Sequence, residues 1–134
     1  DWLPAPTKGR ALNVDYKTTD DATEAAFQRT AARLGYHLQG AWYEDAILAT
    51  GTAREAATLW VVQEREAPYL VAVHQLGVDE MELGRDLGAR ARHIYAGCTK
   101  SGQWPGYPNQ ISTITFPEWV YRDAESILEG GDLA

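Results

Sequence analysis

Asp15 and Lys17 are the residues whose types and spacing most directly indicate chemistry. They stand two positions apart at the end of an apolar segment, residues 11–14, that reads as a β-strand, so their side chains share one face. The carboxylate can hold a hard divalent cation, the backbone carbonyl of Tyr16 can add an oxygen ligand, and the lysine can orient water and balance phosphate charge. The pattern indicates metal-assisted phosphodiester hydrolysis, with a surface ion pair as the alternative.

A second candidate pair lies in a segment of helical periodicity that follows. Gln39 and Tyr43 are four residues apart, which places them on one face of a helix. His37, in the same segment, could contact a phosphate or pack against a neighbouring helix. The helix must therefore lie near the strand for these groups to act together.

These segments resemble one family when they are taken in chain order. The matching elements are VDYKTT (14–19), YHLQ (36–39), WY (42–43) with Asp45, WP (104–105) and PEW (117–119). In that order they resemble the nuclease domain of the RecE-type exodeoxyribonuclease VIII, a branch of the PD-(D/E)xK superfamily. The resemblance runs from Asp1 to about Trp119. It implies that the chain is the C-terminal portion of such a domain, truncated at its N-terminal side.

The resemblance assigns a role to each candidate residue. It implies that Asp1 and Asp15 are metal ligands, together with the backbone carbonyl of Tyr16. The implied cation is Mg²⁺, with Mn²⁺ as an alternative. The implied catalytic set is Asp1, Asp15, Lys17, Gln39 and Tyr43, and the implied DNA-binding set is Gln39, Tyr43, His37, Arg29 and Arg33.

The net charge of −7 is unusual for a DNA-binding protein. The five basic and five acidic residues within positions 1–35 balance, so all of the excess acid lies further along the chain. A cation bound by Asp1 and Asp15 would make the motif-bearing part locally positive. No strong basic stripe is present, and an acidic domain without a nucleic-acid partner stays open as an alternative.

The activity implied by the resemblance is specific. It is a Mg²⁺-dependent exodeoxyribonuclease that digests linear double-stranded DNA from its ends, 5′ to 3′ and without ATP, in recombination or repair. The implied partners are DNA ends, a single-strand annealing protein and further copies of the chain, in the cytoplasm of a bacterial or phage-infected cell and away from membranes. The alternative is a DNA-binding or scaffold module that keeps the fold without activity. The single cysteine, Cys98, excludes an internal disulfide or a cysteine-clustered metal site.

The periodicity predicts the elements that must position these residues. We expect a hairpin over residues 2–17, a helix capped by Asp20 or Asp21 that ends at Gly35, and a second helix over 36–49. Strands over 58–63 and 69–74 and a helix over 78–98 follow. The expected fold is an α/β, restriction-endonuclease-like core with a small mixed sheet flanked by helices. It would occupy residues 1–125, with a loose tail over 126–134.

Overall fold

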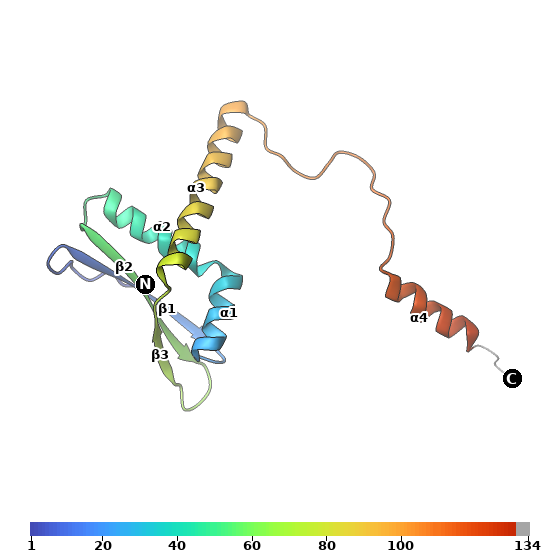
Figure 1. Ribbon diagram of the computed structural model, residues 1–134, viewed down its shortest axis with the longest axis horizontal. Coiled ribbons are helices and arrows are strands. Elements are labelled where there is room, and N and C mark those ends of the chain that lie inside the picture. Colours follow the sequence, from blue (N-terminus) through green and yellow to red (C-terminus); the bar gives the residue numbers. More distant parts are fainter. Residues whose placement is uncertain (131–134) are drawn as a thin grey trace. The chain divides into compact units, whose positions relative to one another are not determined.

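The computed structural model describes residues 1–130, which divide into two units. The first unit comprises Asp1–Gln103 and the second begins at Trp104. The first unit contains, in order, β1 (Arg10–Thr19), α1 (Glu24–Leu34), α2 (Tyr36–Ala49), β2 (Glu55–Glu64), β3 (Val71–His74) and α3 (Val78–Ser101) (Figure 1). The second unit contains α4 (Glu118–Glu129).

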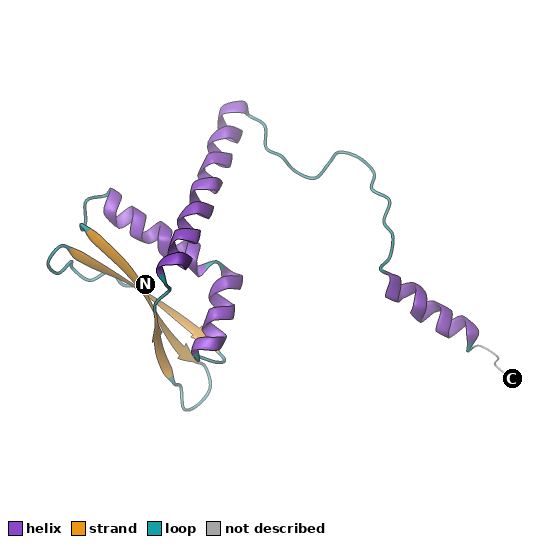
Figure 2. Cartoon of the chain, in the orientation of Figure 1, coloured by secondary structure: helices purple, strands orange, loops and turns teal. Residues whose placement is uncertain are grey.

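The three strands form one mixed sheet in the order β1-β2-β3. β1 and β2 are parallel, with Asp15 opposite Trp60, and β3 pairs with β2 in the antiparallel direction. Parallel neighbours need a long crossover connection, which α1 and α2 supply here. Figure 2 shows the helices of this unit gathered on one side of the sheet. The expected small mixed sheet with flanking helices is therefore confirmed.

The alternation of side chains along β1 decides what faces the helices. Ala11, Asn13 and Asp15 are buried, whereas Leu12 and Tyr16 between and beyond them are exposed on the opposite face. This period of two is the geometry of an extended strand with one covered face. It turns Asp15, and with it Lys17, toward the helices.

The core under the helices is centred on Trp60, whose side chain is fully buried. Phe27 and Ala31 of α1 and Ala41 of α2 pack around it with Val62 of β2. Gly40 lets α2 lie close to the sheet, because a Cβ atom at that position would be 2.8 Å from the indole ring of Trp60. The core thus fixes the distance between α2 and the strand that carries Asp15.

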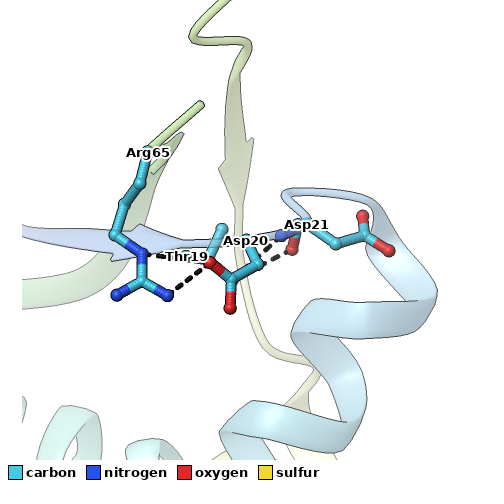
Figure 3. Close-up of polar contacts among 4 residues, drawn as sticks. All are labelled: Thr19, Asp20, Asp21 and Arg65. Carbon is cyan, nitrogen blue, oxygen red and sulfur yellow. Dashed lines mark hydrogen bonds and ion pairs between the residues drawn. The ribbon is translucent and has the colours of Figure 1, made fainter. Parts of the chain in front are cut away.

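The connection from β1 to α1 is held by polar contacts to the loop after β2 (Figure 3). The guanidinium of Arg65 binds the carboxylate of Asp20, and its backbone N–H donates to the Thr19 carbonyl at 2.9 Å. Thr23 is the N-cap of α1, and the carboxylate of Asp21 accepts from the Thr23 N–H at 2.8 Å. The predicted cap at Asp20 or Asp21 is wrong, because both carboxylates are engaged in the preceding turn.

Other elements also differ from the sequence-based expectation. The expected hairpin is reduced to two isolated bridges, Trp2 with Val14 and Thr7 with Arg10. The first unit ends at Gln103, and the expected extent of the nuclease core over residues 1–125 stays a prediction. The segment 126–129, expected to be loose, lies inside α4, and residues 131–134 of the expected tail lie outside the described residues. None of the helices described in residues 1–130 is long and apolar enough to cross a membrane.

Candidate active site

Asp15 and Lys17 form a close ion pair on the covered face of β1. The Lys17 Nζ lies 2.6 Å from Asp15 Oδ1, and the Asp15 side chain is 1% exposed. Apart from this ion pair, neither carboxylate oxygen has a hydrogen-bond partner. A buried charge with spare acceptor capacity is costly, which favours a functional role over a surface ion pair.

Lys17 continues into a chain of polar side chains on α2. Its Nζ donates to Gln39 Oε1 at 3.4 Å, and Gln39 Nε2 donates to the Tyr43 hydroxyl at 3.4 Å. The Lys17 ammonium also lies 4.9 Å from the centre of the Tyr36 ring. The structure thus brings together four residues of the predicted catalytic set, Asp15, Lys17, Gln39 and Tyr43.

Asp1 is placed beside β1 by a short antiparallel bridge. Trp2 and Val14 exchange two backbone hydrogen bonds of 2.8 Å, and this register puts Asp1 opposite Asp15. Residues directly opposite each other in antiparallel strands project to the same face. Asp1 also lines a cavity of about 210 Å³ with Tyr43, so it lies on the side of the candidate site.

The available ligands for a cation are oxygen atoms. Among residues 1–130 no group of three or more histidine, cysteine, aspartate or glutamate side chains could hold a metal ion. The carboxylates of Asp1 and Asp15 with the backbone carbonyl of Tyr16 stay the predicted ligand set; the Tyr16 side chain is half exposed and bonds to Gln63. Hard oxygen ligands and a buried carboxylate with free lone pairs fit Mg²⁺ or Mn²⁺.

The other predicted DNA-binding residues lie outside this polar chain. Arg29 and Arg33 are exposed on α1, one turn apart. His37 lies where α2 crosses α3, because its backbone carbonyl closely approaches Gly84. A contact between these three side chains and DNA stays a prediction.

Sequence reasoning missed a partly buried ionic cluster between α2 and α3. Arg85 Nη2 lies 2.8 Å from Glu44 Oε2, and Arg85 Nε lies 3.2 Å from Asp45 Oδ1. Glu44 is buried although it is charged. Its spacing from Ala41 and Ile47, three residues on either side, was a signal that it faces the core. The cluster joins α3 to the helix that carries Gln39 and Tyr43.

Glu44 gives this cluster a pH dependence. Burial raises the pKa of its carboxyl above the usual 4.5, and the Thr58 hydroxyl and the positive charge of Arg85 oppose part of this shift. The folded protein therefore holds the proton more tightly than the unfolded chain. The contribution of Glu44 to the free energy of unfolding falls as the pH rises from the pKa of this carboxyl in the unfolded chain through its raised pKa in the folded protein.

Replacing Glu44 by glutamine is expected to remove this fall in the free energy of unfolding with rising pH. The free energy of unfolding of the variant, relative to the wild type, should rise with pH across that window, as measured by urea unfolding at a series of pH values. Glu82→Gln, at an exposed position on α3, is the matched control and should keep the wild-type slope. Parallel curves for Glu44→Gln and wild type would contradict the assignment.

A comparison of the sequence with known proteins identifies the family of the chain. The family model described as "PDDEXK-like domain of unknown function (DUF3799)" matches residues 7–116. The chain belongs to this family. Asp15, Lys17, Gln39 and Tyr43 lie within the matched residues, and Asp1 lies before them. Among curated proteins nothing matches the chain.

A solved structure gives the same result for the fold of this PDDEXK-like chain. It is a protein from Eubacterium rectale described as a putative exonuclease, with a TM-score of 0.51 and 9% sequence identity. The match covers 95% of this chain and 49% of that protein, so the chain corresponds to about half of its length. The predicted restriction-endonuclease-like α/β fold is confirmed, while membership of the RecE-type branch stays a prediction.

Proposed function

We propose that the chain is a metal-dependent deoxyribonuclease that digests linear double-stranded DNA from its ends, 5′ to 3′ and without ATP. The observation that carries the proposal is the buried Asp15 carboxylate. It is paired with Lys17 and otherwise free of hydrogen bonds, at the start of a polar chain to Gln39 and Tyr43. The family membership supports a nuclease, and the resemblance to the RecE-type domain supports the substrate and polarity.

The side chains divide the chemistry between them. When bound by Asp1, Asp15 and the Tyr16 carbonyl, a divalent cation supplies charge neutralisation and a more acidic water. Lys17 donates hydrogen bonds to the attacking water or to a phosphate oxygen, where negative charge develops. Gln39 accepts from Lys17 and so fixes the direction of the ammonium group. Tyr43, whose hydroxyl accepts from Gln39 at the far end of the polar chain, donates its own proton to the DNA backbone.

The experiment that tests the proposal is digestion of a 5′-labelled linear duplex beside a covalently closed circle. We expect release of the label from the linear duplex with Mg²⁺ or Mn²⁺ and not with EDTA, while the closed circle is neither nicked nor linearised. Lys17→Met should lower the rate by about 10²-fold or more, because it removes a donor to the developing charge. Lys100→Met, at the exposed end of α3, should leave the rate unchanged.

Two outcomes would contradict the proposal in different ways. Cleavage of the closed circle would show an endonuclease and overturn the end-dependent part of the proposal. A metal-dependent mobility shift of DNA without any hydrolysis would favour a DNA-binding module that keeps the fold without activity. The Lys17 ion pair is the observation behind that second candidate, because it already compensates the Asp15 charge.

A further inference from the structure

A cavity of about 510 Å³ lies between α2 and α3 beside the candidate site. Its walls are mainly apolar and include Leu34, Leu38, Trp42 and Ala91. We propose that this cavity binds an unpaired nucleobase at the end of the DNA substrate, with Trp42 as the stacking surface. The inference rests on the proposed function and adds the feature of the DNA end that the site selects.

The cavity is continuous with the polar chain of the candidate site. Gln39 and Tyr43 line one side of it. Gln39 also bonds to Lys17, which in turn pairs with Asp15. A nucleotide whose phosphate meets Lys17 therefore has its base within reach of the cavity. Of the two neighbouring cavities of about 310 and 210 Å³, the first is lined by neither Gln39 nor Tyr43 and the second by Tyr43 alone.

Trp42 supplies the chemistry that recognises a base. Its side chain is 51% exposed, although it borders an apolar cavity. Aromatic side chains stack on the faces of unpaired bases whatever the sequence. The guanidinium of Arg92 lies over the Trp42 ring, 5.3 Å from its centre, and Arg92 does not line the cavity, so a base would stack on the ring face that Arg92 leaves open, with this positive charge behind the ring. A flat aromatic wall with a flanking arginine fits a nucleotide better than an aliphatic ligand.

The size and polarity of the cavity favour an unpaired base over a base pair. Its volume is within the usual range for sites that hold one small organic group. A paired base within a duplex has both faces covered by its neighbours, so it must leave the stack before it can lie on Trp42. The site should therefore prefer ends that fray or carry a 5′ overhang over blunt, G·C-rich ends.

The test is a thermodynamic cycle that combines a protein change with a DNA change. Binding of a duplex with a 5′ overhang is measured with Ca²⁺ in place of Mg²⁺, for DNA with a terminal base and with an abasic terminal position. The proteins are wild type, Trp42→Ala and Trp42→Phe. Leu48→Ala, a truncation of an apolar side chain that is 42% exposed on the same helix, is the matched control.

We expect Trp42→Ala to weaken binding by about 5-fold to 150-fold, the range for loss of one stacked base. The abasic DNA should weaken binding to wild type by a similar factor, with little further loss when both changes are combined. Trp42→Phe should recover most of the affinity, and Leu48→Ala should not differ from wild type. If Trp42→Ala folds poorly, Trp42→Leu takes its place in the cycle, because it keeps an apolar side chain and removes the aromatic face.

Failure of this inference can be told from failure of the proposed function. If hydrolysis requires Lys17 while the terminal base and Trp42 have independent effects or none, the cavity does not bind the base and the nuclease proposal stands. If neither hydrolysis nor DNA binding occurs, both proposals are overturned. If Trp42→Ala weakens binding to abasic and normal DNA equally, Trp42 acts without the terminal base, and the base-binding proposal is overturned.

Discussion

Asp15→Asn is expected to lower the rate of DNA hydrolysis by at least about a thousand-fold, because the cation loses its buried charged ligand. The substitution preserves the size of a side chain that is 1% exposed, and Lys17 keeps its hydrogen bond to Gln39. The fold should therefore survive, as measured by circular dichroism. The rate is measured with saturating Mg²⁺ on a labelled linear duplex.

The matched control is Asp20→Asn, which makes the same chemical change five residues along the chain. Asp20 is 79% exposed and pairs with Arg65 at the corner after β1 (Figure 3). An exposed ion pair contributes little, so activity and stability should stay close to wild type. Equal losses in both variants would mean that Asp15 acts through general stability, and the metal-ligand assignment would be wrong.

Gly84→Ala is expected to destabilise the protein by about 2–3 kcal/mol, since it forces two packed helices apart. A Cβ atom at Gly84 would lie 2.1 Å from the backbone carbonyl oxygen of His37, and a backbone atom cannot move aside alone. The measurement is urea unfolding of the variant and the wild type. Because α2 carries Gln39 and Tyr43, the nuclease activity should also fall.

Gly97→Ala, on the same helix, is the control for Gly84→Ala. Nothing lies within 4 Å of a Cβ atom at Gly97, so alanine there should stabilise the helix by about 0.5–1 kcal/mol. Opposite signs for the two variants would identify helix contact as the cause. If both variants stabilise the protein, α2 and α3 do not approach each other at Gly84 as closely as the structure shows.

Local patterns in the sequence were sufficient for most of the elements. The helix over Tyr36–Ala49 has the bounds expected, and Gly35 ends α1 in the left-handed conformation that favours glycine. One failure came from a long-range partner that local patterns do not reveal, because Asp20 reads as a helix cap until Arg65, 45 residues away, takes its carboxylate. Helix α4 was missed although Val120, Ala124 and Ile127 repeat at helical spacing, so a local signal for it was present.

The candidate site shows the same limit. The spacing of Asp15 to Lys17 and of Gln39 to Tyr43 is local and was readable from the chain. The link between the two pairs, from Lys17 to Gln39, depends on how α2 returns across the sheet. Long-range pairs such as Glu44 with Arg85, or Trp42 with Arg92, have no local signal, because their partners lie on separate helices.

The parallel pairing of β1 with β2 has a consequence for the time at which activity can appear. Asp15 and Trp60 are partners in this ladder although 45 residues separate them, and both helices of the crossover lie between. During synthesis on the ribosome, Asp15 and Lys17 emerge early, but their strand has no neighbour until residues 55–64 follow. Such distant pairing forms late in folding. We therefore expect a nascent chain to lack the proposed nuclease activity until β2 has paired with β1.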